Sequence, residues 1–431
     1  MTLTPQLTTA EAQHIVRKLG ESGIPPSRGL EAYTVGIDSL LGTLESEYLR
    51  GYLPDGGSSF KLVVGEYGSG KSHFLYRLRD KAWEHGYVVS RTELSPKECP
   101  YDNQLKVYQA VISNLIYHDA DPEVEDAFGL EAFLENHFHR TLRTLGVEET
   151  RTSVGIDLRA RLWLDTILRF KIESPSYRHA VYFYLQAIAE EDEAKRRLLG
   201  AWLRGESISL RDVREFSITE RMDRSVAFKM LRSLAQLVHE LGYSGLVLLF
   251  DEGDRMVSIG SSRMERVACD NLREVIDRCA GESLPSALFV YAVPPYFVTN
   301  IAPQYEALSQ RIGTKVKFSR KNPYSVQISL DQLDYPGEEL LRMIGARLLG
   351  VFETAYEMKF DEEIQRQNIA RLAESCASLL STSHRRHFVK SLMSVLTEQR
   401  VEGERLYEAD GLQGVVRQVT EELGRTEVGE Y

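Results

Sequence analysis

Cysteine, basic charge and long apolar runs are all scarce in this chain of 431 residues. Its four cysteines are scattered without a C-x-x-C pair, which argues against a zinc site and against a disulfide framework. No apolar run approaches the roughly 20 residues that a membrane helix needs. The first residues, MTLTPQLTTAEAQ, have neither the basic nor the apolar segment of a signal peptide. We therefore expect a cytoplasmic protein with reduced thiols and no membrane contact.

The net charge of −11 opposes broad electrostatic binding to nucleic acid, because that binding comes largely from neutralising phosphates. A local basic patch remains compatible with it. The densest basic cluster consists of Lys315, Lys317, Arg320 and Lys321. A solvated strand edge explains this cluster equally well.

One stretch carries a phosphate-binding pattern. An apolar strand that begins at Phe60 runs directly into G-x-x-x-x-G-K-S at residues 65–72 and then into a helix. Glycines allow successive main-chain N–H groups to turn inward around a phosphate, and the helix N-terminus adds partial positive charge. Lys71 is predicted to reach the β and γ phosphates, and Ser72 to coordinate Mg²⁺. The predicted nucleotide-binding residues of this stretch are Gly65, Tyr67, Gly68, Ser69, Gly70, Lys71, Ser72 and His73. The alternative is a glycine-rich turn without a ligand.

A second pattern follows about 180 residues later, where the apolar run Gly245-Leu-Val-Leu-Leu-Phe ends in Asp251 and Glu252. Acidic residues at the carboxyl end of a parallel strand lie in the crevice where such sheets bind ligands. Asp251 is predicted to hold Mg²⁺, and Glu252 to polarise the water that attacks the γ phosphate. The alternative for Asp251 is a capping residue after a buried strand.

Strand patterns occur at five places, residues 60–64, 87–94, 245–250, 286–292 and 326–330, with helices between them. A strand followed by a helix and another strand favours parallel pairing. We predict an α/β P-loop NTPase fold with a five-stranded parallel sheet, a large helical insertion and a C-terminal helical lid. The predicted divisions are 1–104 (N-terminal helices and first part of the core), 105–237 (insertion), 238–330 (second part of the core) and 331–431 (lid).

Three further sites are candidates for nucleotide contacts. Val35 and Gly36 precede the P-loop strand and suit an adenine ring, although an interdomain turn explains them too. Arg311 follows the fourth strand by about twenty residues, and its fork of donors suits a transferring phosphoryl group. Arg385 or Arg386, at the start of a late helix, is placed to reach back to the nucleotide. The alternative for Arg311 and Arg386 is a solvated surface arginine.

These features together resemble the AAA+ ATPases of the origin-recognition and STAND-like branch. More narrowly, the chain resembles the BrxD family of ATP-binding proteins from BREX phage-defence systems. The resemblance covers roughly residues 10–396 and is carried by residues 65–75, 88–98, 201–206, 241–252 and 305–312. It implies ATP and Mg²⁺ as cofactors and an AAA+-like core. It also implies that Lys71 and Ser72 are Walker A, Asp251 and Glu252 Walker B, Arg311 a finger-like arginine and Arg386 the sensor-2 arginine.

The chain departs from the AAA+ pattern at the end of the fourth strand. That strand normally ends in Asn, Ser or Thr, whereas here it ends in Ala292-Val-Pro-Pro295, so sensor 1 is absent or displaced to Thr299 or Asn300. This departure favours slow hydrolysis or a nucleotide-held switch.

The expected function is an ATPase of a bacterial phage-defence system that couples Mg-ATP binding and hydrolysis to remodelling of a protein or DNA complex. The alternatives are a nucleotide-held scaffold with little turnover and a replication-initiator-like DNA-binding ATPase. Expected partners are proteins of the defence complex and DNA, bound directly or through a partner. A homo-oligomer is expected if Arg311 acts in trans.

Overall fold

The chain forms two compact units, each built from segments that are far apart in the sequence. The structure is a computed structural model that describes residues 7–95, 99–118, 127–148, 150–152, 155–253, 262–281, 283–313, 316–379 and 384–428. Unit 1 comprises Met1–Thr43, Val63–Leu78 and Val316–Tyr431, and unit 2 comprises Leu44–Leu62 and Arg79–Lys315. Strand β1 (Ser58–Val64) runs from unit 2 into unit 1, and helix α3 (Lys71–Glu84) runs back into unit 2.

Seven strands form the main sheet, in the order β4-β3-β2-β7-β8-β1-β9. The five predicted strands are all present, as β1, β2 (Tyr87–Glu93), β7 (Gly245–Asp251), β8 (Ala287–Val293) and β9 (Gln327–Ser329). Strand β7 pairs in parallel with β2 and with β8. All residues of β7 and β8 are buried, which explains their uninterrupted apolar sequences. The predicted α/β fold is confirmed.

The sheet has two strands more than predicted. Strands β3 (Leu115–Tyr117) and β4 (Ala127–Phe128) lie inside the stretch that we assigned to helices, and they extend the β2 edge by antiparallel pairing. Each has only two or three residues, which is too short for an alternating pattern to be recognised in the sequence. A separate small hairpin joins β5 (Arg151–Thr152) and β6 (Gly155–Ile156).

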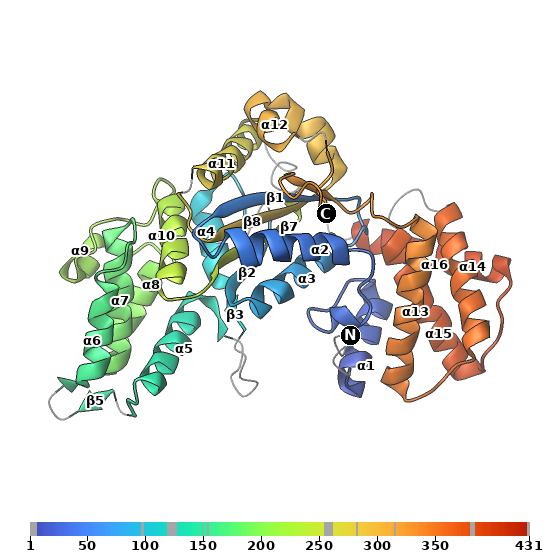
Figure 1. Ribbon diagram of the computed structural model, residues 1–431, viewed down its shortest axis with the longest axis horizontal. Helices are drawn as coiled ribbons and strands as arrows, with labels where there is room; N and C mark the ends of the chain where they lie inside the picture. Colours follow the sequence, from blue (N-terminus) through green and yellow to red (C-terminus); the bar gives the residue numbers. More distant parts are fainter. Residues whose placement is uncertain are drawn as a thin grey trace. The chain divides into compact units, whose positions relative to one another are not determined.

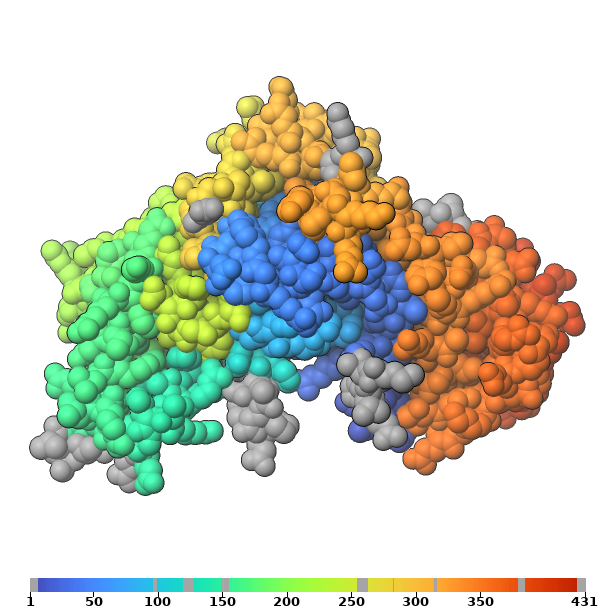
Figure 2. Space-filling model, in the orientation of Figure 1, coloured from blue at the N-terminus to red at the C-terminus, as the bar shows by residue number. Residues whose placement is uncertain are grey.

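The rest of unit 2 is mainly helical, as predicted for residues 105–237. Helices α5 to α8 gather in the green part of Figure 2, and α7 packs on α5, α6 and α8. Buried aromatic and aliphatic side chains line α7, so it forms the centre of this group. The helices here are α4 (Gln104–Ser113), α5 (Gly129–Thr144), α6 (Leu158–Ile167), α7 (Pro175–Glu190), α8 (Glu193–Leu203), α9 (Leu210–Val213), η3 (Arg214–Phe216) and α10 (Ala227–Glu240).

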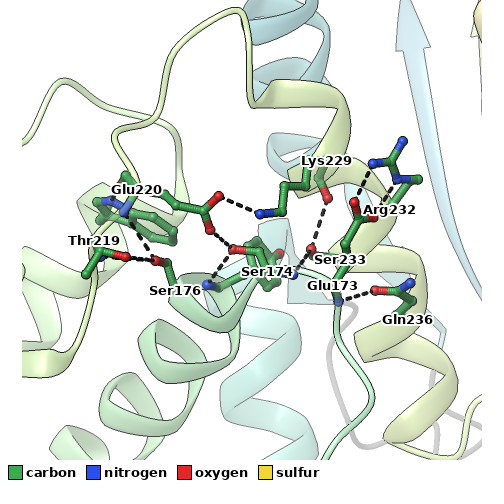
Figure 3. Close-up of polar contacts among 11 residues, drawn as sticks. Glu173, Ser174, Ser176, Thr219, Glu220, Lys229, Arg232, Ser233 and Gln236 are labelled. Carbon is green, nitrogen blue, oxygen red and sulfur yellow. Dashed lines mark hydrogen bonds and ion pairs between the residues drawn. The ribbon is translucent and has the colours of Figure 1, made fainter.

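A polar network fixes the N-terminus of α7 to the loop before α10 (Figure 3). Ser174 caps α7 by accepting from the Tyr177 N–H at 3.1 Å and donates to Glu220 Oε2 at 2.5 Å. Lys229 Nζ lies 2.6 Å from the other oxygen of Glu220. Because Ser174 is fully buried and already bonded, this network is structural rather than a reactive serine site.

Unit 2 contains several further helices. Helix α11 packs against α12. The bounds are η2 (Glu45–Tyr52, a π-helix), α11 (Ser262–Ala280), η5 (Phe297–Ile301, a π-helix), η6 (Ala302–Gln304) and α12 (Glu306–Ile312).

Unit 1 contains a helical bundle in which α1 (Thr9–Ser22) packs beside α13 and α15 (Figure 1). A capping box begins α1, with Thr8 and Glu11 each bonded to the other's backbone N–H. One apolar core joins α1 to the late helices, so residues more than 300 positions apart fold together. The other helices are η1 (Leu30–Ala32), α2 (Asp38–Leu44), α13 (Gly337–Tyr356), α14 (Glu362–Leu379), α15 (His384–Glu402) and α16 (Ala409–Val428).

Among the described residues, no helix combines the length and the apolar character that crossing a membrane requires.

Candidate functional site

The predicted phosphate-binding loop lies in unit 1 between β1 and α3. Gly68 and Gly70 have φ values of 73° and 92°, in the left-handed region that other residues rarely adopt. A Cβ atom at Gly65 would lie 2.3 Å from Ser69 Oγ and 3.1 Å from Ser69 Cβ, so any larger residue there would displace the Ser69 side chain. Three of the glycines of the pattern are therefore required by the loop's own geometry.

Polar groups of the chain itself hold the loop. Lys71 Nζ donates to the main-chain oxygens of Gly65 at 2.9 Å and Glu66 at 3.1 Å. The Glu66 N–H donates to Asp331 Oδ2 at 3.0 Å, from the segment that follows β9. Ser69 Oγ is buried and has no hydrogen-bond partner among the described residues. An unsatisfied buried hydroxyl inside a loop with an ammonium group is an environment that an anionic oxygen would satisfy.

The two arginines at the start of α15 both contact this loop. Arg385 donates from Nη1 to the Ser69 carbonyl and from Nη2 to the Leu330 carbonyl at 2.7 Å. Arg386 donates from Nη1 to the Tyr67 hydroxyl and from Nε to the Ser22 carbonyl at 3.1 Å. Burial lowers the pKa of the Arg385 guanidinium, an effect that the Asp331 carboxylate partly offsets. Arg385 thus bonds the main chain of the loop and Arg386 a side chain of it, and the sensor-2 role of Arg386 stays a prediction.

His73 lies in the first turn of α3 and is held by Thr34. Thr34 Oγ1 donates to the Leu30 carbonyl at 2.7 Å, so it accepts from His73 Nε2–H at 2.8 Å. Burial, together with the positive charges of Arg77 and Arg385, lowers the pKa of His73 to about 3. His73 is therefore neutral at physiological pH, and it ties the segment around Thr34 to the helix that carries Lys71. Ser72, which precedes it, is half-buried in the same turn.

Gly36 has a structural role in unit 1. Its φ is 80°, and a Cβ atom there would lie 2.6 Å from Leu340 Cδ1 of α13. Val35 packs partly buried against the core of the same unit. The close backbone approach that we attributed to an adenine ring is thus made to Leu340, and the adenine contact of Val35 and Gly36 stays a prediction.

The second predicted pattern lies in unit 2 at the end of β7. The Asp251 carboxylate is buried and accepts from the Glu252 N–H on Oδ1 at 3.1 Å. Glu252 has a φ of 56°, which places a non-glycine residue in the left-handed region at a cost of about 1–2 kcal/mol. Such strain is typical of functional positions, because only other constraints keep it in the folded chain. The next residue, Gly253, is confined by the Ala292 carbonyl, which lies 2.6 Å from the position of an added Cβ.

Arg91 on β2 is the partner of Asp251 that our reading of the sequence missed. Its Nη2 lies 2.7 Å from Asp251 Oδ2, and its Nη1 lies 3.1 Å from Glu93 Oε1. The signal was present in the sequence: an arginine stands two residues before the end of a strand that begins with the buried run Tyr87–Ser90. Asp331 was missed in the same way, although it is an acidic residue just after β9, where loop residues of such sheets meet ligands.

Arg311 lies on α12 and is engaged elsewhere in unit 2. Nε and Nη2 bond the two carboxylate oxygens of Asp277 on α11, the second at 3.0 Å, and Nη1 donates to the Ala307 carbonyl at 2.6 Å. The bond to Asp277 raises the pKa of Arg311. The finger role of Arg311 stays a prediction, and it would require this ion pair to open.

The candidate sensor residues lie on η5, beyond the end of β8. Thr299 Oγ1 is 3.1 Å from the Pro295 carbonyl and 2.6 Å from Asn300 Oδ1. Both side chains are exposed and bond within their own turn.

The residues present fit ATP and Mg²⁺ chemically. The glycine loop, Lys71 and the α3 N-terminus supply donors and positive charge for phosphates. Ser72 in unit 1 has a hydroxyl oxygen and Asp251 in unit 2 has carboxylate oxygens, and both are ligand types that Mg²⁺ prefers.

Comparison with known proteins identifies the family. The family model described as "BREX system ATP-binding protein BrxC/D" matches residues 7–409. The chain belongs to this BREX family. None of the curated proteins compared with the chain matches it. The chain is also similar to a solved chain described as "Structure of the Aeropyrum Pernix ORC2 protein (ADPNP-ADP complexes)", at 12% identity and a TM-score of 0.46. That match covers 94% of this chain and 71% of the other.

Proposed function

We propose that this BREX family member binds Mg-ATP and hydrolyses it to remodel a protein or DNA complex in phage defence. The observation that carries the proposal is the loop of unit 1, in which Lys71, three geometrically required glycines and a buried unsatisfied Ser69 hydroxyl surround one site. The family match over residues 7–409 supports the ATP and BREX assignments.

The proposal assigns residues to each chemical role. Lys71 would leave the carbonyls of Gly65 and Glu66 and neutralise the β and γ phosphates. Ser72 and Asp251 would hold Mg²⁺, which when bound neutralises charge on the phosphate oxygens. Glu252, in its strained conformation, would orient and deprotonate the attacking water. Arg311, or one of the α15 arginines, would stabilise charge on the transferred group.

Steady-state phosphate release with and without DNA and purified BREX proteins tests the proposal. Lys71→Ala should abolish nucleotide binding, and Lys81→Ala on the same helix is the matched control because Lys81 lies ten residues beyond Lys71 and forms its ion pairs with Glu84 and Glu45. Glu252→Gln should bind ATP and fail to hydrolyse it. Unchanged turnover in Glu252→Gln would show that the base has been misassigned.

A nucleotide-held switch with little turnover is the second candidate. The polar side chains nearest the end of β8, Thr299 and Asn300, are bonded to each other and to their own turn, which leaves the water without the usual orienting group. This candidate predicts tight ATP binding with phosphate release that stays slow in the presence of every partner. Sizing the protein with and without a non-hydrolysable analogue shows whether binding drives assembly, as a trans role of Arg311 requires.

Direct DNA binding is favoured by one turn of unit 1. Lys317, Arg320, Lys321 and Tyr324 are exposed there, and none of their side chains forms an ion pair or hydrogen bond with the described part of the chain. Asn322 rigidifies the turn by donating from Nδ2 to the Val316 and Lys317 carbonyls. Lys315 of the predicted cluster lies outside the described residues.

Basic side chains beside an exposed tyrosine suit a phosphate backbone with accessible bases. Replacing all three basic residues by alanine should reduce the slope of log affinity for single-stranded DNA against log salt concentration by the equivalent of up to about three phosphate contacts. Equal affinity and salt slope in the triple variant would exclude this turn as the contact.

A further inference from the structure

Arg91 lies between two carboxylates on adjacent strands of unit 2. The register of β2 and β7 places Glu93 opposite Asp251 and Arg91 opposite Leu249. Because side chains alternate along a strand, Arg91, Glu93 and Asp251 project from the same face. The guanidinium contacts both acids, with Nη2 at 2.7 Å from Asp251 and Nη1 at 3.1 Å from Glu93.

The two carboxylates differ sharply in their access to water. The Asp251 side chain is 4% exposed and that of Glu93 is 64% exposed. Like charges directly opposite each other on paired strands are destabilising, and a buried carboxylate is costly without a counter-charge. Water can solvate the charge of Glu93, whereas the buried charge of Asp251 depends on Arg91 for neutralisation.

The same carboxylate is the proposed Mg²⁺ ligand, so two cations need it. A divalent ion near Asp251 would repel the fixed charge of Arg91 and would compete for the lone pairs of Oδ2. Arg91 has a second carboxylate partner within contact distance, because Nη1 already lies beside Glu93 Oε1. Its charge therefore need not be left unpaired when Asp251 takes another cation.

We propose that Arg91 is an exchangeable counter-ion of Asp251, which neutralises this carboxylate without Mg²⁺ and is released to Glu93 when Mg-nucleotide binds. In this role Arg91 is a positioning residue that sets the Mg²⁺ affinity of the site. The inference rests on the proposed function, because it takes Asp251 to be the magnesium ligand.

The test is a titration with Mg²⁺ of the full chain saturated with a non-hydrolysable ATP analogue, in which calorimetry measures the Mg²⁺ affinity. Arg91→Met removes the competitor and should tighten Mg²⁺ binding by about tenfold, the equivalent of one charge-assisted hydrogen bond. Glu93→Gln removes the alternative ion-pair partner of Arg91 and should weaken Mg²⁺ binding several-fold. Glu215→Gln, at an exposed position of unit 2, makes the same charge change away from the strand end and should leave the affinity unaltered.

Opposite shifts in the two variants are the signature of exchange. Unchanged or weaker Mg²⁺ binding in Arg91→Met, or unchanged or tighter binding in Glu93→Gln, would overturn the proposal. If Arg91→Met does not fold, Glu93→Gln alone decides. Failure of the proposed function is a distinct result, since the unmodified chain would then bind no ATP analogue, or would bind it with no response to Mg²⁺ or to Asp251→Asn.

Discussion

Replacing Arg385 by methionine tests how unit 1 holds the loop between β1 and α3 that we propose binds phosphates. Arg385 makes two charge-assisted hydrogen bonds to main-chain oxygens, one on the loop and one at Leu330. Each such bond contributes about 1.5–3 kcal/mol. Burial of the guanidinium, which lowers its pKa, offsets part of this gain. We therefore expect Arg385→Met to reduce the free energy of unfolding of unit 1 by about 2 kcal/mol.

The matched comparison is Arg386→Met on the neighbouring position. Arg386 bonds the exposed Tyr67 hydroxyl and one carbonyl, so its loss should cost about 0.5–1 kcal/mol. Thermal unfolding should show a decrease of about 4–8 °C for Arg385→Met and about half of that or less for Arg386→Met. Arg385→Lys keeps the charge without the two-pronged geometry and should lie between them.

Binding of a fluorescent ATP analogue completes this experiment. Arg385→Met should weaken binding by about tenfold, because the loop carbonyl that it holds is released and the donors of the loop lose their fixed directions. Equal losses of stability in the two methionine variants, or a larger loss in Arg386→Met, would refute the inference that Arg385 is the arginine that stabilises the loop.

Three further predictions concern packing, pH and thiol reactivity. Gly65→Ala should destabilise unit 1 by about 1–3 kcal/mol and weaken ATP binding, and adding Ser69→Gly should restore part of the lost stability, because the new methyl group meets Ser69 Oγ. Since the pKa of His73 falls from about 6.5 in the unfolded chain to about 3, the unfolded state binds the extra proton between these values. The free energy of unfolding should therefore decrease as the pH falls through this window, by up to about 1.4 kcal/mol per pH unit. Chemical denaturation at pH 7 and at pH 5 measures this decrease, which should be smaller in His73→Gln than in the unmodified chain. Burial raises the pKa of all four cysteines to about 12. A thiol reagent at pH 8 should therefore label the native chain far more slowly than the denatured chain. Rapid labelling of the native chain would contradict this burial.

The order of elements and the chemistry of the loop were determined by the sequence alone. Five strands were predicted correctly, since buried parallel strands are continuous apolar runs, and Gly68 and Gly70 stand at the left-handed backbone positions that need glycine, while phosphate binding by the loop stays a prediction. The acidic residues after β7 were recognisable for a similar reason, because the carboxyl end of a parallel strand is marked by where its apolar run stops.

Tertiary structure decided which groups meet. Arg385 and Arg386 are adjacent on one helix and indistinguishable by type, and only the packing of α15 in unit 1 directs one to Ser69 and the other to Tyr67. The pairing of Arg91 with Asp251 depends on the register of two strands that are 160 positions apart. The helical and strand periods of the sequence reveal which face of an element is buried, but not which other element packs against that face. The partners of these arginines depend on that neighbouring element.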